Sequence, residues 1–143
     1  MKKFTLKNRT VVMEHPTSLH NYFGWPSVTT LQDGTLAAVA SGFRLEHLCP
    51  FGKLCLSLSK NGGKTWSLPT PVIDTVLDDR DAGLCPFGES GLIFTSFNAG
   101  VETHRKYNEE RTDPLRKAYI EAYLNTVSEQ EEQRISGLTY RVS

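Results

Sequence analysis

The sequence predicts an all-β protein built from small antiparallel sheets, and two observations lead to this fold class. Short runs rich in β-branched and aromatic residues occupy the first two thirds of the chain, and Gly, Pro, Asn or Asp bound each run. Asp33-Gly34 joins two of the runs with a residue pair that favours a tight type I′ hairpin turn, in which both central residues have positive φ. The predicted strands are Arg9–Glu14, Pro26–Leu31, Thr35–Ser41, Lys53–Ser59 and Gly91–Phe97.

The hairpin unit is repeated. Pro26–Ser41 aligns with Ala82–Phe97 without a gap, and Leu54–Ser59 matches Leu138–Ser143 if an insertion precedes the second copy. A repeat of short antiparallel strands is typical of a β-propeller, whose four-stranded blades pack face to face. We therefore expect about one and a half to two blades in one partial domain over 1–143, with blade one at about 22–75 and an incomplete blade two at about 79–143. Such a chain is expected to be a truncated portion, or one piece of an assembly that supplies the other blades.

The insertion predicts one amphipathic helix at about 113–131. Asp113 is a favourable N-cap residue, and Pro114 suits the first helical position because its missing N–H has no partner there. Apolar residues at helical spacing are expected to form the buried stripe, with a charged face toward solvent. This stripe comprises Leu115, Ala118, Tyr119, Ala122 and Thr126 or Val127.

The composition excludes several classes of partner. Lys and Arg together number 16, as do Asp and Glu, so no long-range field favours nucleic acid or an anionic membrane. No segment resembles a signal peptide or a membrane span, and a cytoplasmic protein is expected. The three cysteines lack paired spacing and are expected to be buried free thiols. No metal-ligand spacing or Gly-rich phosphate loop occurs, so neither metal nor other cofactor is expected.

The stretch S-K-N-G-G-K-T-W, residues 59–66, has the composition of a turn that stabilises itself. Asn and Ser side chains can bond backbone amides across the turn, the glycines accept positive φ, and the tryptophan ring can cover the loop. The stretch resembles the Asp-box, S-x-D-x-G-x-T-W, of sialidases and related BNR-repeat propellers, with Asn in place of the usual Asp. In that family the box is structural and lies away from the active-site face. Its residues here are Ser59, Asn61, Gly63, Thr65 and Trp66.

The segment F-G-W-P-S-V-T-T-L-Q-D-G-T-L-A-A-V-A-S-G-F-R, residues 23–44, is similar to the first blade of a sialidase. The family has Arg-Ile before the proline, whereas this chain has Gly24 and Trp25. The arginine that would hold a sialic acid carboxylate is therefore missing, which argues against a plain sialidase. The resemblance implies an exo-acting glycoside hydrolase, or a fragment of one, with a carbohydrate substrate.

Two segments are expected to face the mouth of the central channel, where propellers bind ligands. In the alignment, Trp25 corresponds to Asp81, and strand alternation is expected to point Asp79 and Asp81 the same way. Crowded carboxylates raise one another's pKa, which suits a general acid, while Arg80 offers a bidentate hold on a carboxylate or diol. The alternative is that Arg80 forms an ion pair that stabilises the loop. Tyr22 and Trp25 are expected to stack on a sugar ring, although Trp25 equally suits a core.

By the resemblance, the loop 42–51 occupies the place of the family's acid/base loop. Arg44 is a second candidate for holding substrate, and either Glu46 or His47 could transfer a proton; taken singly, each of the three suits a surface role better. Three functions remain open: a glycoside hydrolase, a carbohydrate-binding module without hydrolysis, and an inactive remnant. Self-association to complete the propeller is also considered, because exposed strand edges invite pairing.

Overall fold

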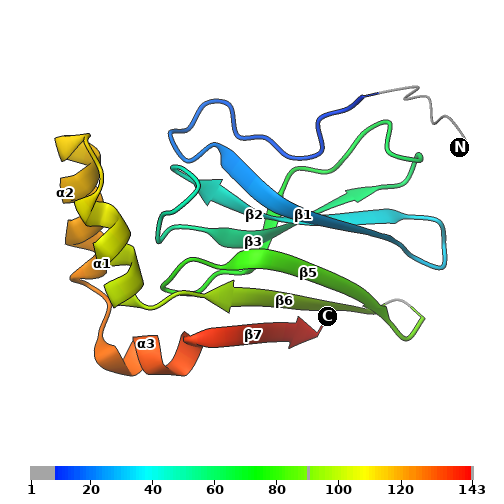
Figure 1. Cartoon of the computed structure of the whole chain (residues 1–143). Coiled ribbons are helices and arrows are strands. Elements are labelled where there is room, and N and C mark those ends of the chain that lie inside the picture. Colours follow the sequence, from blue (N-terminus) through cyan, green and yellow to red (C-terminus); the bar gives the residue numbers. More distant parts are fainter. Residues whose placement is uncertain (1–8, 90, 143) are drawn as a thin grey trace, which may run out of the picture.

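The structure is a computed structural model that describes residues 9–89 and 91–142. In this part of the chain, two antiparallel sheets and three helices form a mostly β protein (Figure 1). The first sheet pairs its strands in chain order: Tyr22–Thr30 (β1), Leu36–Arg44 (β2), Lys53–Ser59 (β3) and Thr70–Ile73 (β4). The second sheet contains Arg80–Phe87 (β5), Gly91–Asn98 (β6) and Gly137–Val142 (β7), also in chain order. The helices Val101–Glu109 (α1), Pro114–Leu124 (α2) and Glu129–Ile135 (α3) connect β6 to β7.

The repeat predicted from the sequence is present in the backbone. The β1–β2 and β5–β6 hairpins pair in the same register, with both partners shifted by 56 residues. The third strand follows the same rule with a shift of 84 residues, because the helices are inserted before β7. The equivalent pairs are Ser27–Val39 with Gly83–Thr95, and Ala37–Leu58 with Ile93–Val142.

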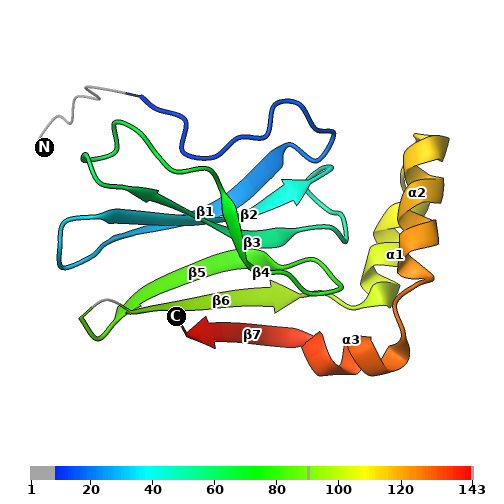
Figure 2. The ribbon, with the colours of Figure 1, turned by 180° about the vertical axis from the view of Figure 1, so that it is seen from behind.

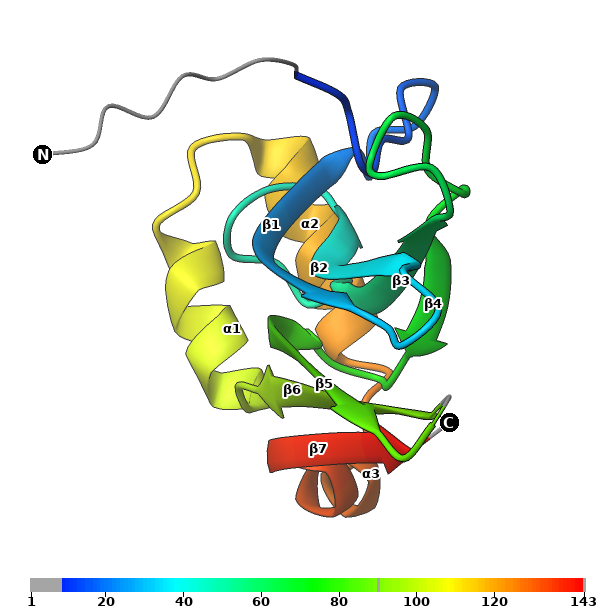
Figure 3. The ribbon, with the colours of Figure 1, turned by 90° about the vertical axis from the view of Figure 1, so that its right-hand side faces the viewer.

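The two sheets pack face to face as adjacent layers (Figure 3). Alternate residues of β2, β3 and β4 meet alternate residues of β5 and β6, as the two-residue period of a strand requires. Burial of these apolar side chains provides the main stabilisation between the layers. The core consists of Ala37, Val39, Leu54, Ile73, Ala82, Leu92 and Phe94.

The helices stand at one end of both sheets, where β2 and β6 end (Figures 1 and 2). A second apolar cluster forms there from Leu77, Val101, Ile120 and Leu124. The cluster anchors α1 and α2 beside the loop that precedes β5. No helix in the described residues is long and apolar enough to cross a membrane.

The predicted single helix at 113–131 is wrong in its extent. Asp113 does cap α2, accepting hydrogen bonds from the backbone N–H groups of Leu115 and Arg116 at 3.0 and 3.2 Å. The chain then breaks after Leu124, and a capping box at Ser128 starts α3. The sequence pattern also gave no indication of α1.

The predicted apolar stripe of α2 is wrong as well. Leu115 and Tyr119 are 82% and 51% exposed, whereas Ile120 and Leu124 are buried. The helix carries apolar residues on two sides, and contact with Leu77 and α1 determines which side is covered. Periodicity alone could not distinguish the two sides, because the packing partner had not been predicted.

Two further local predictions differ from the structure. Residues 9–14 form no strand; they run along the outside of the first sheet, where Val12 and Met13 border the β1–β2 face. The Asp33-Gly34 turn is not type I′, because of the two residues only Gly34 has positive φ, at 82°. Instead, a longer loop closes through a 2.8 Å hydrogen bond from the Leu31 N–H to the Thr35 carbonyl. The Asp33 carboxylate also accepts a hydrogen bond from the Thr35 N–H at 2.9 Å.

Candidate functional site

Strands β1 and β5 begin side by side at the end of the sheets that carries the helices, and the Ser27 hydroxyl joins them by donating to the Ala82 carbonyl at 2.7 Å. Trp25 and Asp81 occupy equivalent bulges in these strands, with φ of 52° and 56°. A left-handed backbone at a residue other than glycine costs about 1–3 kcal/mol, and such strain concentrates at functional sites. The repeat therefore presents two strained residues at the same rim.

Four predicted site residues gather at this rim and are called here the rim cluster: Tyr22, Trp25, His47 and Arg80. The His47 ring centroid lies 4.9 Å from that of Trp25. The Arg80 guanidinium carbon lies 4.6 Å from the Trp25 ring centroid, and Tyr22 Oη is 3.4 Å from His47 Nδ1. Beyond its contact with Trp25, the Arg80 guanidinium forms no hydrogen bond or ion pair with any residue that the structure describes.

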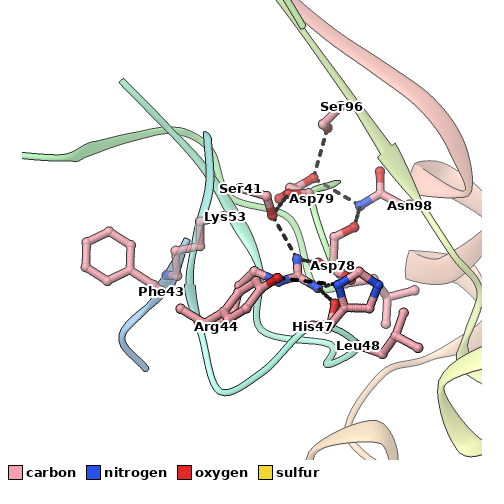
Figure 4. A network of polar contacts seen from close by, with 12 residues as sticks. Ser41, Phe43, Arg44, His47, Leu48, Lys53, Asp78, Asp79, Ser96 and Asn98 are labelled. Carbon is pink, nitrogen blue, oxygen red and sulfur yellow. Dashed lines mark hydrogen bonds and ion pairs between the residues drawn. The ribbon is translucent and has the colours of Figure 1, made fainter. Parts of the chain in front are cut away.

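Arg44, predicted to hold substrate, is fully buried and belongs to the network of polar contacts drawn in Figure 4. Its guanidinium forms a two-point ion pair with Asp78, also fully buried, and donates to the Ser41 hydroxyl at 2.8 Å. Its remaining donors bond the carbonyls of Glu46 and His47 at 3.3 and 2.7 Å. All five donors are occupied, and the guanidinium carbon lies 4.7 Å from the Trp25 centroid. Arg44 therefore positions Trp25 and the His47 loop.

Asp79 is also internal, which rules out direct contact with a ligand in this conformation (Figure 4). Its carboxylate accepts hydrogen bonds from the Thr75 N–H at 2.7 Å, the Ser96 hydroxyl at 3.2 Å and the Asn98 amide at 3.0 Å. Burial raises the pKa of Asp79, and the hydrogen bond from the Thr75 backbone opposes this shift. The bulge breaks strand alternation, so Asp81 is exposed while Asp79 is not; the expectation that they point the same way is wrong.

Glu46 is held by the helical insertion. Its carboxylate accepts hydrogen bonds from Arg111 Nε and, at 3.1 Å, from Arg116 Nη1. Arg111 also donates to the Leu48 carbonyl, so the connection between α1 and α2 clamps the loop after β2. Beside this clamp, a hollow of about 260 Å³ opens next to His47. It is lined by Glu46, His47, Leu48, Tyr107, Glu110 and Arg111.

A buried histidine lies beneath the same end of the sheets. His104, on α1, is 2% exposed, and its Nε2 has no hydrogen-bond partner among the described residues. Burial lowers its pKa to about 4, and the charges of Arg44, Arg80 and Arg111 add to this effect. The ring is therefore neutral at pH 7, so it adds no charge next to the three guanidinium groups.

The Asp-box stretch forms the predicted self-stabilised turn. The Asn61 Oδ1 accepts the Thr65 N–H at 3.0 Å, and the Ser59 hydroxyl accepts the Gly63 N–H at 2.9 Å. Gly62 and Gly63 have φ of 68° and 82°, as such a turn requires. Ser59 pairs with the first residue of β2, so the turn lies at the opposite end of the sheet from the rim cluster.

Comparisons with protein-family models, with curated proteins and with solved structures found no match. Within the described residues, no group of three or more His, Cys, Asp or Glu side chains is arranged to hold a metal ion. Cys49 and Cys55 are buried as expected, but Cys85 is exposed on β5.

Several residues that shape the site were not among the predicted site residues. Asp78 lies in the run D-D-R-D at 78–81, and its position two residues before a strand gave no sign of its buried partner. Arg111 and Arg116 lie far along the chain, so only the fold of the insertion brings them to Glu46. No local pattern marked Thr75, Ser96, Asn98 or His104.

Proposed function

We propose that this chain forms two blades of a sialidase-like β-propeller that acts on a carbohydrate at the rim, as part of a glycoside hydrolase. The observation that supports this most directly is the pair of equivalent bulges at Trp25 and Asp81, which present an aromatic ring and a carboxylate at neighbouring strands. The Asp-box turn at the far end of the first sheet agrees with the same architecture. Propellers typically have about four to eight blades, so under this proposal further sheets complete the ring.

The rim cluster has the chemistry of a sugar site. An aromatic face can pack against the C–H groups of a pyranose ring, and Trp25, which contacts His47, Arg44 and Arg80, would supply that face. The Arg80 guanidinium donates no hydrogen bond to the described residues, so its donors suit a carboxylate or a pair of hydroxyls. The hollow beside His47 adds space and polar groups for a second part of the ligand.

Hydrolysis requires a proton donor at the glycosidic oxygen and a second group across the sugar ring. Of the carboxylates predicted to be catalytic, only Asp81 is both exposed and without a hydrogen bond or ion pair to the described residues. Asp81 is therefore the candidate general acid. The second group would lie in another blade.

Carbohydrate binding without hydrolysis is the second candidate function. It is favoured because two of the predicted catalytic carboxylates, Asp79 and Glu46, already accept hydrogen bonds from other residues of the fold. The rim cluster would then act as a binding platform, with Asp81 as a hydrogen-bond acceptor.

A paired experiment distinguishes the two functions. The Trp66→Phe variant leaves Trp25 as the single tryptophan, and its emission is titrated with a panel of neutral and anionic monosaccharides and their aryl glycosides. A saturable change that is lost in Trp66→Phe/Arg80→Met supports sugar binding at the rim. Release of the aryl group, abolished in Asp81→Asn, supports hydrolysis, whereas binding without release supports a module. The absence of any saturable response across the panel would contradict both functions.

A further inference from the structure

Each sheet has one face packed on the other sheet and an opposite face that the described residues cover in part. On the second sheet, the packed face is formed by Ala82 and Leu84 of β5 and by Phe94 of β6. Strand alternation puts Ile93, Thr95 and Phe97 on its opposite face, and Phe97 is 44% exposed.

The repeat relates each free face to a packed one. Under the shift of 56 residues, Pro26, Val28 and Ala38 of the first sheet are equivalent to Ala82, Leu84 and Phe94 of the second. The free face of the first sheet is therefore equivalent to the packed face of the second. This free face, here called the β1–β2 outer face, is defined by Pro26, Val28 and Ala38.

The converse relation holds for the other free face. Ala37 and Val39 pack against the second sheet. Under the same shift they are equivalent to Ile93 and Thr95. The face defined by Ile93, Thr95 and Phe97, here called the β6 outer face, is equivalent to the packed face of the first sheet. The two outer faces of the chain are therefore equivalent to the two faces that pack against each other inside it.

The β1–β2 outer face is shaped to receive bulky side chains. An apolar groove of about 490 Å³ runs along it, bordered by Met13 and Trp66. Ala38, 5% exposed at the floor of the groove, is small where the second sheet carries Phe94, and Val28 is 67% exposed. The β6 outer face offers larger apolar groups, so the two faces are complementary in size rather than alike.

We propose that two copies of this chain associate head to tail, with the β6 outer face of one copy packed on the β1–β2 outer face of the next. This contact repeats the packing between the two sheets of a single copy, and it is heterologous, so successive copies close into a ring or extend into a filament. The inference rests on the sheet repeat and not on carbohydrate binding, so failure of the sugar experiment leaves it intact.

The oligomeric state of the full chain tests the contact. Light scattering after gel filtration, over a series of protein concentrations, is expected to show a mass about two to four times that of one copy, because about four to eight sheets close a propeller. Val28→Asp and Phe97→Asp, which each place a charge in one of the two faces, are expected to yield monomers. Leu68→Asp is the matched control, since Leu68 is 84% exposed in the loop before β4.

Mixing the two monomeric variants gives the decisive result. Each variant keeps one intact face, so a head-to-tail contact predicts a one-to-one pair and nothing larger. A chain that stays monomeric at all concentrations would overturn the proposal. So would an oligomer that neither Asp variant disrupts, or two variants that do not combine.

A second measurement needs no substitution and applies if an Asp variant fails to fold. Cys85 alternates with Leu84 on β5, so its exposed thiol lies on the free side of the second sheet, whereas Cys49 and Cys55 are buried. The rate at which a thiol reagent labels Cys85 is expected to fall as protein concentration rises. A labelling rate independent of concentration would count against the contact.

Discussion

Arg44 and Asp78 are opposite charges that share a site closed to solvent. Replacing one partner leaves a buried charge without compensation, which typically costs about 3–5 kcal/mol. We expect Asp78→Asn to lower the free energy of unfolding by about this amount, and the double variant Arg44→Met/Asp78→Leu to lose less, because it leaves no unpaired charge. Urea denaturation of the wild type, of Asp78→Asn, of the single variants Arg44→Met and Asp78→Leu, and of the double variant checks this. A double variant as unstable as the sum of the two single variants would show that the charges act independently.

His104 predicts a dependence of stability on pH. Its pKa is lowered from 6.5 to about 4 in the folded protein, so between these values the unfolded chain binds a proton that the folded chain does not. Stability from this residue is therefore present above pH 6.5 and is lost as the pH falls. From pH 7 to pH 5 the loss is about 2 kcal/mol, given about 1.4 kcal/mol per pKa unit.

The matched comparison isolates this residue from other titrating groups. Urea unfolding of the wild type and of His104→Leu at both pH values is expected to show a smaller pH effect in the variant. His47→Ala serves as the control, since His47 is exposed. Equal pH effects in wild type and His104→Leu would mean that His104 is protonated in the folded state as readily as in the unfolded chain.

At the level of single residues, the position of Trp25 and Asp81 at one rim could be predicted, but which carboxylates of the rim are buried could not. Alignment of the hairpins brought Trp25 and Asp81 to one rim because register depends on strand periodicity, which the sequence carries. The run of acidic residues at 78–81 gave no means of telling which carboxylate is buried. That depends on Arg44, on Asn98 and on the bulge, all of which are set by tertiary packing.

At the scale of elements, the Asp-box turn is the unit that joins β3 to β4. The Asn61 side chain accepts from the Thr65 N–H at 3.0 Å and donates to the Thr65 hydroxyl at 2.7 Å. Asn61→Ala is expected to cost about 1–2 kcal/mol, since the loss leaves a backbone donor without its partner. Asn61→Asp keeps the acceptor, and the Thr65 hydroxyl can then donate, so thermal unfolding is expected to match the wild type within about 0.5 kcal/mol. An alanine variant of wild-type stability would contradict a structural role for the turn.

The contact of Glu46 with the helical insertion is a second prediction at this scale. Arg111 is only 11% exposed in this ion pair, so losing the pair is expected to reduce stability more than losing a surface pair would. We expect Glu46→Gln to destabilise the protein by about 1 kcal/mol and to speed hydrogen exchange in α1 and in the connection to α2. Glu121→Gln is the control, because its pair with Arg105 is about 40% exposed on both sides and is expected to contribute less. Equal exchange rates in both variants would show that Glu46 does not clamp the helices.

The elements that could be predicted are those with local signals. Strand β3 was predicted with its observed bounds, since alternation and flanking turn residues mark both of its ends. The helical segment was recognised only where Asp113-Pro114 caps α2. Helix α1 follows Gly100, which supplies no side-chain cap, and its apolar residues are few. Its stabilising contacts are tertiary: with α2, with the loop before β5, and with Glu132 of α3, which accepts the Val101 N–H at 2.8 Å.

At the scale of the whole molecule, the two sheets are expected to unfold as one unit. Phe94 is 1% exposed and joins the second sheet to the small residues Ala37 and Val39 of the first. Removing its ring leaves a cavity between the layers, and such a substitution typically costs about 3–5 kcal/mol. Because both sheets depend on this core, Phe94→Ala is expected to weaken both together rather than the second sheet alone.

Two probes that report on different parts of the fold check this cooperativity. Fluorescence follows Trp25 and Trp66, which belong to the first sheet and its Asp-box turn, while far-ultraviolet circular dichroism follows the helices inserted in the second sheet. In wild type the two urea transitions are expected to coincide, and in Phe94→Ala both are expected to move to lower urea by the same amount. Cys55 offers a matched buried control, since Cys55→Ala removes one atom from the opposite face of β3 and is expected to shift the transitions less. A fluorescence transition unchanged by Phe94→Ala would mean that the first sheet holds its structure without the second, and that the repeat consists of two independent sheets rather than one packed pair.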